Sequence, residues 1–412
     1  MYTQTSGTTG KSKYIPVTHG SLRGLKASQA ISSMMMYQAC PQAFQGKMLG
    51  IVGPSHEGIN EWGKPCGSAS GLVLESMPKI TRANQLLPKA VNNIENYDAK
   101  CDLMLLYALA APDLSFIGSA NPSTLLCMAN RLNERHQFYL DILSQKGTGR
   151  TDTRLLPNQR ELLVGIQCRK QRLLELKKLF ATKSAVGFAD LWPGLKLVVT
   201  WTGGSCGIPL SALARMLPES CRIMELGYIA SEFRGTITAG NAGLGIPTLH
   251  ENFFEFAEKN SWESGCRDFL RLHEIEEGID YYVFVTNRNG LYRYDINDIV
   301  RVSGRFENTP CLEFVQKGRG VTNITGEKLS EAQLGAALHE LSRDLEIHPV
   351  FYICLADEAN RSYHLYLEAA KPEQITNAGI CACLERSLGM QNIEYRAKRV
   401  SRRLSAIGVS LL

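Results

Sequence analysis

A short segment near the start of the chain, Thr5–Lys13, constrains its fold and function more than any other. It reads TSGTTGKSK and combines two glycines with several hydroxyl side chains and with lysines. Glycine lets the backbone turn so that successive N–H groups converge on an anion. Hydroxyl groups add donors, and a lysine adds a positive charge on a mobile stem. This composition is typical of a loop that holds a polyphosphate, although a polar surface loop can share it.

The tail of this segment also matches the end of a Walker A loop, the phosphate loop of P-loop NTPases. The pattern G-x-x-x-x-G-K-[ST] requires a glycine at position 5, where this chain has Thr5. Pro16 follows soon after and is excluded from a helix interior, so the long helix expected directly after a Walker A loop is interrupted. We therefore disfavour a P-loop NTPase, and cleavage of ATP to ADP would restore that reading.

The composition is that of a globular enzyme. The chain has 412 residues, of which 44% are hydrophobic and 21% charged, enough for two or three domains with a large core. The net charge of +5 is mild and does not argue for nucleic acid. The basic segment 154–183 lacks interleaved aromatic residues, so we interpret it as the solvated face of a helix.

Cysteine usage and hydropathy bear on the compartment. Twelve cysteines are scattered without disulfide-framework spacing, which favours reduced thiols. The start of the chain lacks a basic segment followed by an apolar run, and the most apolar stretch, Leu103–Ala111, is too short to span a bilayer. We predict a cytoplasmic protein without a membrane or nucleic-acid partner.

The first three quarters of the chain mix helix and strand patterns. Leu195–Trp201 predicts a buried strand, and Glu161–Phe180 has helical periodicity. Tyr281–Thr286, the turn Asn287–Gly290 and Leu291–Tyr294 together predict a hairpin. The mixture indicates an α/β fold for this large part, which we assign to residues 1–310.

A different pattern begins near Cys311. Ser330 starts a capping box and a helix that we extend to about Arg343. The segments that follow are predicted as two strands, a helix and a last strand: Val350–Leu355, Tyr363–Ala369, Glu373–Leu388 and a start near Ile393. This β-α-β-β-α order suits a small α+β domain, residues 311–412, joined through a mobile linker, Lys317–Gly320.

Three further segments could serve a nucleotide. Gly203 and Gly204 follow the buried strand, where bare backbone can lie against a purine, although a glycine pair there is usually a turn. In Glu225–Glu232, ELGYIASE, an aromatic ring, a hydroxyl and a carboxylate could stack on adenine, contact a phosphate and hold Mg²⁺, or else cap a helix start. Asp298, in the segment LYRYDINDIV, could bind both ribose hydroxyls, or serve a turn.

In this order and spacing the motifs TSGTTGKSK, Y-x-A-S-E and Y-x-x-x-D resemble those of the adenylate-forming superfamily, and in particular its auxin-responsive acyl acid–amido synthetase branch. Asn252–Phe256, Glu276–Tyr282 and Asn323–Lys328 look like the same branch, and the resemblance covers about residues 3–405. It implies a large firefly-luciferase-like N-terminal domain with a small mobile C-terminal domain. Because family members extend beyond both ends of this sequence, we expect the first segment and the last part of the small domain to be missing here.

The resemblance also implies roles for individual residues. The residues implied to bind the phosphates are Thr5, Ser6, Gly7, Thr8, Thr9, Gly10, Ser231 and the catalytic Lys13. Gly204, Ser205 and Tyr228 are implied to bind adenine, and Asp298 is implied to bind ribose. Arg319, in the linker, is also implied to bind the nucleotide. Glu232 is the implied Mg²⁺ ligand, and Lys328 is the implied catalytic lysine of the small domain, although it could be an ordinary surface lysine.

The third motif departs from the family pattern Y-R-x-G-D. It reads Tyr294-Asp295-Ile296-Asn297-Asp298, so the arginine and glycine are replaced. Asparagine tolerates left-handed backbone, so we expect the turn to survive. Asp295 removes a positive charge, for which we expect Arg293 or Arg301 to compensate.

The implied activity is a two-step ligation. A carboxylic acid attacks the α-phosphorus of ATP to give acyl-AMP and pyrophosphate, and an amine, in this branch typically an amino acid, then takes the acyl group as an amide. An acyl-CoA ligase shares the first step, and a non-catalytic nucleotide-binding remnant would bind ATP alone. The sequence leaves the acid, the amine and the oligomeric state open.

Overall fold

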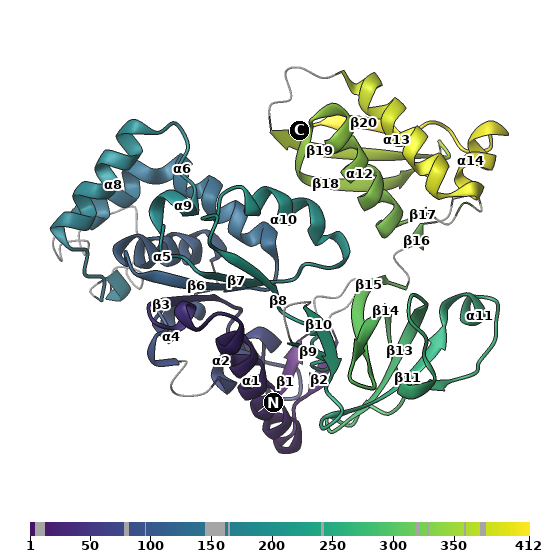
Figure 1. Cartoon of the computed structure of the whole chain (residues 1–412), viewed down its shortest axis with the longest axis horizontal. Helices are drawn as coiled ribbons and strands as arrows, with labels where there is room; N and C mark the ends of the chain where they lie inside the picture. The colour runs from purple at the N-terminus through teal and green to yellow at the C-terminus, as the bar shows by residue number, and fades with distance from the viewer. Residues whose placement is uncertain are drawn as a thin grey trace.

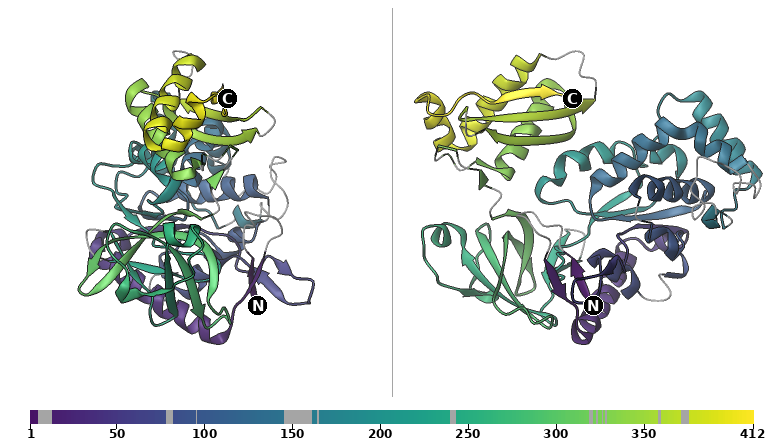
Figure 2. Two further views of the ribbon diagram at one scale, coloured as in Figure 1. Left: turned by 90° about the vertical axis from the view of Figure 1, so that its right-hand side faces the viewer. Right: turned by 180° about the vertical axis from the view of Figure 1, so that it is seen from behind.

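The computed structural model describes residues 1–4, 13–77, 82–94, 96–144, 161–163, 165–239, 243–318, 321–322, 324–325, 327, 329–357, 360–370 and 376–412. Within these residues the chain forms a large part built on two sheets and a small part at the C-terminus (Figure 1). In both views of Figure 2 the small part lies at the opposite end of the molecule from the N-terminus.

The first half of the large part is a parallel sheet between two helical layers. Its order is β3-β6-β7-β8, with all neighbours parallel. The strands are Lys47–Ile51, Leu114–Ser119, Leu197–Thr200 and Arg222–Glu225. Along β7, Val198 packs into the main core whereas Leu197 and Val199 pack on the other side. Both faces are therefore covered, as a parallel sheet requires.

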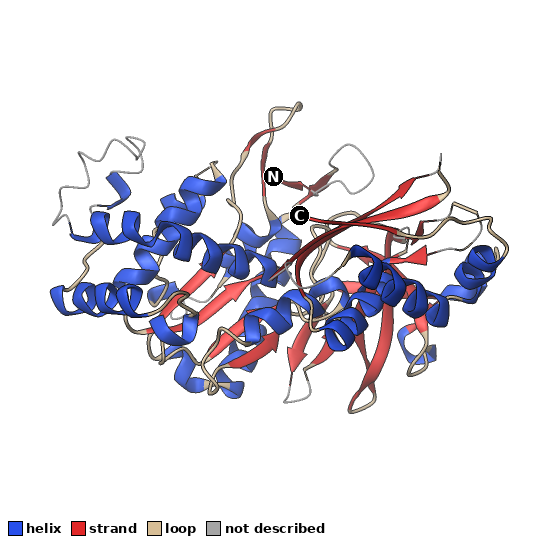
Figure 3. Ribbon diagram, turned by 90° about the horizontal axis from the view of Figure 1, so that it is seen from above, coloured by secondary structure: helices blue, strands red, loops and turns tan. Residues whose placement is uncertain are grey.

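Helices flank this sheet on both sides, as Figures 1 and 3 show. One side carries α5 (Tyr97–Ala110), α6 (Pro122–Ser144), α8 (Lys170–Thr182), α9 (Phe188–Leu191) and α10 (Gly207–Ala214). The other carries α1 (His19–Ala39) and α2 (Ala69–Ser76), with η1 at Pro41–Phe44, whereas α4 (Lys89–Asn92) packs against α5 through Val91 of the main core. The apolar stretch Leu103–Ala111 comprises the largely buried C-terminal part of α5 and its C-cap residue, and no helix in the described residues is long and apolar enough to cross a membrane.

The second half of the large part is an antiparallel sheet of order β12-β11-β13-β14-β15. Its strands are Leu270–Arg271, Asn252–Glu258, Asp280–Asn287, Tyr294–Phe306 and Thr309–Lys317, with α11 at Lys259–Glu263 and η4 at Leu272–Glu274. A hairpin of β9 (Thr236–Ala239) and β10 (Leu244–Pro247) connects it to the parallel sheet. The predicted hairpin around Asn287–Gly290 is confirmed, although its second strand begins only at Tyr294.

A small sheet holds the N-terminus. Its order is β2-β1-β5-β4, with strands Tyr14–Pro16, Tyr2–Gln4, Pro65–Gly67 and Gly58–Ile59. Because β1 and β2 pair antiparallel, with Gln4 opposite Tyr14, the segment predicted to hold phosphates joins two adjacent strands.

The boundary predicted between residues 310 and 311 falls inside β15. This strand pairs with β14 from Phe306↔Thr309 to Asp298↔Lys317, so the whole of Thr309–Lys317 belongs to the large part. We therefore move the boundary past Lys317.

The small part is a sheet of order β18-β19-β20 covered by helices. It comprises β16 (Val321–Thr322), β17 (Leu329–Ser330), α12 (Glu331–Leu345), β18 (His348–Asp357), β19 (Ser362–Ala370), α13 (Asn377–Gln391), α14 (Ile393–Val400) and β20 (Gly408–Leu411). Ser330 caps α12 in the predicted capping box. The α+β prediction is confirmed.

Two element predictions were wrong. The strand expected near Ile393 is helix α14, because Asn392 caps a helix by accepting from Tyr395 N, and the last strand is β20. The helix expected over Glu161–Phe180 is not continuous, since Ile166–Arg169 are not helical and α8 begins at Lys170.

Candidate functional site

Two predicted motifs lie together at the carboxyl ends of neighbouring parallel strands. The segment Thr202–Ser205 follows β7, and Leu226–Glu232 follows β8. The carboxylate of Glu225 joins them, because it accepts from Thr202 N at 2.6 Å and from Gly227 N at 2.8 Å. This edge of a parallel sheet is where α/β folds bind ligands.

Gly204 and Tyr228 meet on the ring of Phe314, which lies on β15. Gly204 begins η3 (Gly204–Cys206) with φ +60°, and a Cβ on it would lie 3.3 Å from the Phe314 ring. Tyr228 stacks on Phe314 with ring centroids 5.8 Å apart. The glycine backbone therefore does lie against a flat ring, but that ring belongs to the protein.

Tyr228 is buried, with 7% of its surface exposed, and its hydroxyl donates to Asp298 Oδ2 at 2.6 Å. Burial, followed by the charge of Asp298, raises the pKa of Tyr228, so the phenol stays protonated and donates. The stacking of Tyr228 on adenine stays a prediction, and in this structure the ring stacks on Phe314. Tyr228 links the second motif to the third.

Asp298 is the centre of the site. Its side chain is 2% exposed, with Tyr228 at Oδ2 and an ion pair from Lys317 Nζ at Oδ1. Burial raises the pKa of Asp298, and the Lys317 charge opposes that rise. Both oxygens predicted to bind ribose hydroxyls are thus paired, and a ribose would share Oδ1 with Lys317 or replace it.

Residues on both sides of the predicted phosphate segment contact the other two motifs. Thr3 Oγ1 donates to the backbone oxygen of Ser231 at 3.0 Å. Lys13 Nζ donates to Tyr294 Oη at 3.2 Å and lies over the same ring at 5.6 Å from its centroid. The chain segments that enter and leave residues 5–12 are therefore held beside the second and third motifs.

Glu232 lies half-buried within electrostatic range of the same groups. Burial raises its pKa, the nearby Asp298 adds to this, and the charges of Lys317 and Lys13 oppose it. Its backbone oxygen accepts from the side-chain amides of Asn287 and Asn289. The predicted site residues Lys13, Ser231, Glu232 and Asp298 thus lie around one region at the junction of the two sheets.

The altered third motif keeps its turn, but neither of the two arginines expected to compensate for Asp295 does so. Asn297 has φ +58°, so the left-handed residue predicted there is confirmed, and its N–H donates to Asp295 Oδ1 at 2.8 Å. Arg293 is paired with Glu255 and Arg301 with Asp280, so neither compensates for Asp295. The cation that serves this motif is Lys317.

Eight predicted site residues lie outside the described part of the chain: Thr5, Ser6, Gly7, Thr8, Thr9, Gly10, Arg319 and Lys328. Next to the last of them, Glu327 accepts from the backbone N–H groups of Ile324 and Thr325 and from Tyr363. Burial raises the pKa of Glu327, but these hydrogen bonds outweigh burial and lower it. Ser205 lies in η3.

Sequence reasoning missed the role of α1, whose buried face is mostly polar. That face consists of Gly24, Ser28, Gln29, Ser32, Ser33 and Met36. It receives Arg234, which directly follows the second motif and donates to Gln29 Oε1 at 2.7 Å and to Ser32 Oγ at 2.9 Å. The helical spacing of small polar residues was the available signal.

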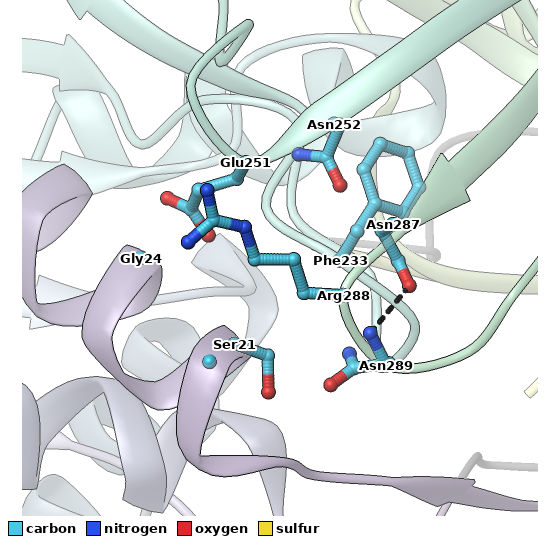
Figure 4. Close-up of a pocket in the computed structure, with 9 residues that line it drawn as sticks. Ser21, Gly24, Phe233, Glu251, Asn252, Asn287, Arg288 and Asn289 are labelled. Carbon is cyan, nitrogen blue, oxygen red and sulfur yellow. Dashed lines mark hydrogen bonds between the residues drawn. The ribbon is translucent and has the colours of Figure 1, made fainter.

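Two adjoining cavities lie between α1 and the second motif. We call the first the apolar cavity: Ser231 and Glu232 stand at its wall, and its apolar side chains include Leu22, Leu25, Leu72, Val73, Ile229 and Ala230. The second, the polar cavity, is drawn in Figure 4 and is lined by Gly20, Ser21, Gly24, Phe233, Glu251, Asn252, Asn287, Arg288 and Asn289. Ser21, Phe233, Glu251 and Asn289 line both, so the cavities adjoin.

The carboxyl group of Glu251 gives a pH-dependent prediction. Burial raises its pKa from 4.5 to about 7, although Arg234 and Arg288 lower it. Between these values the unfolded chain is ionised and the folded one protonated, so folded stability falls as pH rises through this window. Glu251→Gln should therefore gain melting temperature relative to the unaltered protein between about pH 5 and pH 8.

The difference between the two proteins is the quantity to measure, because His250 contacts the same carboxylate and its own pKa is lowered by burial. Glu277→Gln, at an exposed turn, is the matched control and should show no such trend. A melting difference for Glu251→Gln that stays constant across this range would contradict the raised pKa.

The large α/β part, the antiparallel sheet and the small α+β part together define an adenylate-forming fold. The structure superposes on that of the AtGH3.15 acyl acid amido synthetase in complex with 2,4-DB with a TM-score of 0.84 and 17% identity, covering 100% of this chain and 74% of that one. The predicted fold class is confirmed.

The chain belongs to the GH3 family. The GH3 family N-terminal domain matches residues 1–221, the central domain residues 245–317 and the C-terminal domain residues 332–412. The resemblance inferred from the motifs is thus confirmed.

Relatives that match this chain carry names from the same family. The indole-3-acetic acid-amido synthetase GH3.4 of Arabidopsis thaliana is 30% identical over 240 residues, 51% of this chain and 38% of that protein. The 4-substituted benzoates-glutamate ligase GH3.12 of the same plant is 27% identical over 168 residues, 38% of this chain and 28% of that protein. The matches span less than half the length of these relatives.

Proposed function

We propose that this protein activates a carboxylic acid with ATP, forming acyl-AMP and pyrophosphate, and then transfers the acyl group to the amine of an amino acid. One observation carries the proposal: Thr3 and Lys13, on either side of the predicted phosphate segment, contact the second and third motifs near Asp298. Three segments far apart in sequence thus converge, as a single bound nucleotide requires. The relatives named as amido synthetases support the second step.

In the first step the protein aligns two anions and neutralises their charge. Lys13 would place its ammonium near the phosphates, and Asp298 would hold the ribose. The burial of Asp298 and its hydrogen bond from Tyr228 fix the carboxylate in one position. The apolar cavity, which has Ser231 and Glu232 at its wall, would hold the body of the acid with its carboxyl group toward the nucleotide.

Glu232 fits a role as Mg²⁺ ligand. Its pKa is raised by burial, so a cation would stabilise the ionised form that coordinates metal. One carboxylate, with phosphate oxygens and water, is a usual donor set for Mg²⁺. When bound, the ion would offset the repulsion between the carboxylate and the triphosphate. Within the described residues no group of three or more His, Cys, Asp or Glu side chains could hold a metal ion, so the nucleotide would supply further ligands.

The setting that we propose is the cytoplasm. All twelve cysteines are free thiols, which supports a reducing environment. The second step would require the small part to change its position. We propose that the segment after Lys317 is the hinge of this movement, and that the movement would bring Lys328 to the reacting centre.

The test is product analysis. The protein is incubated with ATP, Mg²⁺ and a panel of aromatic, indolic and aliphatic acids, and pyrophosphate release and hydroxamate formation with hydroxylamine are measured. A product with the mass of the amide between the acid and an added amino acid supports the proposal. A thioester formed with CoA would instead assign the second step to an acyl-CoA ligase. ATP binding without hydroxamate for any acid would contradict an activating enzyme.

Lys13→Ala should lower acid-dependent pyrophosphate release at least about tenfold, because loss of one charge-assisted contact is worth about 1.5–3 kcal/mol. Lys64→Ala, which removes a well-exposed lysine of the same small sheet region, is the control. Unchanged release by Lys13→Ala would remove Lys13 from the site.

A further inference from the structure

The apolar cavity leads away from Glu232 and reaches a carboxylate at Glu251. Glu251 and Ser21 line both this cavity and the polar cavity, so a ligand extending along the first would meet the polar groups of the second. Only 11% of the Glu251 side chain is exposed. A buried carboxylate at the end of an apolar pocket is costly unless it is paired, and so it calls for a partner.

The protein satisfies only one of the two oxygens of this carboxylate. Oε1 accepts from Ser28 Oγ and lies 3.3 Å from His250 Nε2. Oε2 has no hydrogen-bond donor within the described residues, and it lies 3.0 Å from where a Cβ on Gly24 would be. A Cβ on Gly24 would also lie only 2.7 Å from Glu251 Cγ, so glycine at this position of α1 makes room for the Glu251 side chain, and both residues line the polar cavity.

A cation faces the same space. Arg288 lines the polar cavity, and its charge acts on Glu251. Figure 4 draws Arg288, Glu251 and Gly24 among the residues that line this cavity, and no ion pair within the described residues joins Arg288 to Glu251. The backbone oxygen of Arg288 is fixed by Thr18 Oγ1 at 2.8 Å, which positions the residue at the start of α1.

A single hydroxyl group could form hydrogen bonds with both Glu251 and Arg288. A hydroxyl donates one hydrogen bond and accepts others, so it can donate to Glu251 Oε2 and accept from Arg288. An ammonium group would be repelled by Arg288 and by Arg234, whose charges both act on Glu251. Above about pH 7, where Glu251 is ionised, a methyl ether would only accept and would leave Oε2 unpaired.

We propose that Glu251 and Arg288 determine specificity for an acid that carries a hydroxyl group at the end opposite its carboxyl. This rests on the proposed function, because it places the acid's carboxyl beside Glu232 and its body in the apolar cavity. A site built to hydrogen-bond a substrate hydroxyl rejects analogues that lack it, because the buried polar groups are then left unpaired.

The experiment compares matched acids. Phenolic acids and ω-hydroxyalkanoates of increasing length are each paired with the methyl ether, the unsubstituted acid and the amine, and kcat/KM for pyrophosphate release is measured. With the unaltered protein, kcat/KM for the best hydroxy acid should exceed kcat/KM for each of its analogues at least about tenfold. Glu251→Leu should lower activity on the hydroxy acid and raise it on the unsubstituted acid, so that the preference is lost or reversed.

Two further variants guard against misfolding. Glu251→Gln keeps the shape of the side chain, and Arg288→Ala alters an exposed residue, so both should fold and both should reduce the hydroxyl preference. Glu277→Leu, at an exposed turn, should leave the preference unchanged. Melting curves of each variant accompany the kinetics.

The outcomes separate the two proposals. If no acid releases pyrophosphate, the proposed function fails. If acids are activated but hydroxy and methoxy members are used equally, and the variants do not alter the ratio, only the role of Glu251 and Arg288 fails. A change in the KM for the amino acid, with acid preference unchanged, would likewise overturn it by placing the amine in the polar cavity.

Discussion

Asp298→Ala is expected to lower acyl-adenylate formation at least about tenfold, because the variant loses a charge-assisted contact to the nucleotide worth about 1.5–3 kcal/mol. Asp298 is the residue on which the second and third motifs and the end of β15 converge. Its replacement should therefore weaken ATP binding as well as turnover. The measurement is pyrophosphate exchange at several ATP concentrations, with a suitable acid at saturation.

The same change removes the partner of a buried phenol, so stability must be measured alongside. Asp298→Asn keeps an acceptor for Tyr228 but loses the charge that pairs with Lys317, and it should separate loss of fold from loss of function. Glu313→Ala, on the exposed side of β15, is the matched control and should leave exchange nearly unchanged. Exchange by Asp298→Ala at the unaltered rate, in a protein that melts normally, would exclude Asp298 from the nucleotide site.

Local signals in the sequence were sufficient where the structure is itself local. The turn Asn287–Gly290, the capping box at Ser330 and the left-handed Asn297 each depend on the chemistry of a few neighbouring residues. Motif order also indicated that Glu232 and Asp298 belong to one region, although Glu232 follows the end of β8 whereas Asp298 lies within β14.

The parts that escaped prediction depend on contacts between distant segments. Lys317 was interpreted as part of a linker, yet it ends β15 and reaches Asp298 through strand pairing that the sequence does not display. Phe314 likewise contacts both Gly204 and Tyr228, two residues for which an adenine-binding role is predicted. Both residues come from a strand cut by the predicted domain boundary.

The polar face of α1 is the clearest case. Hydrophobic periodicity cannot detect a buried face made of Ser28, Gln29, Ser32 and Ser33, because these residues are polar. They are buried since their partners, Arg234 and Glu251, arrive from segments more than two hundred residues away in sequence. Such a face is typical of a site that must hold charge, and Gly24 of the same face lines the polar cavity.

Arg234→Met should be the most destabilising of the substitutions considered. The arginine is 3% exposed and makes hydrogen bonds to Gln29, Ser32 and the backbone oxygen of Thr236. Methionine fills much of the volume but leaves Gln29 and Ser32 buried without these donors, at about 1–3 kcal/mol for each unsatisfied group. Part of this loss is offset, because burying the guanidinium is itself unfavourable, as its pKa lowered to about 10 indicates.

We expect a net loss of about 2–4 kcal/mol, measured as a lower midpoint of urea unfolding. Arg234→Lys keeps a positive charge but cannot make the forked contact to two residues of α1, and should recover only part of the loss. Arg301→Met breaks a more exposed ion pair with Asp280 in the antiparallel sheet and should cost less than about 1 kcal/mol.

The loss should also reach the site, because Arg234 ties the second motif to α1 across the apolar cavity. Below the unfolding midpoint, Arg234→Met should therefore raise the KM for the acid more than it raises the KM for ATP, whose proposed contacts lie on the Asp298 side. Equal increases in both constants would instead indicate a general loosening of the large part. An unchanged urea midpoint would show that the buried hydrogen bonds of Arg234 do not hold α1 in place.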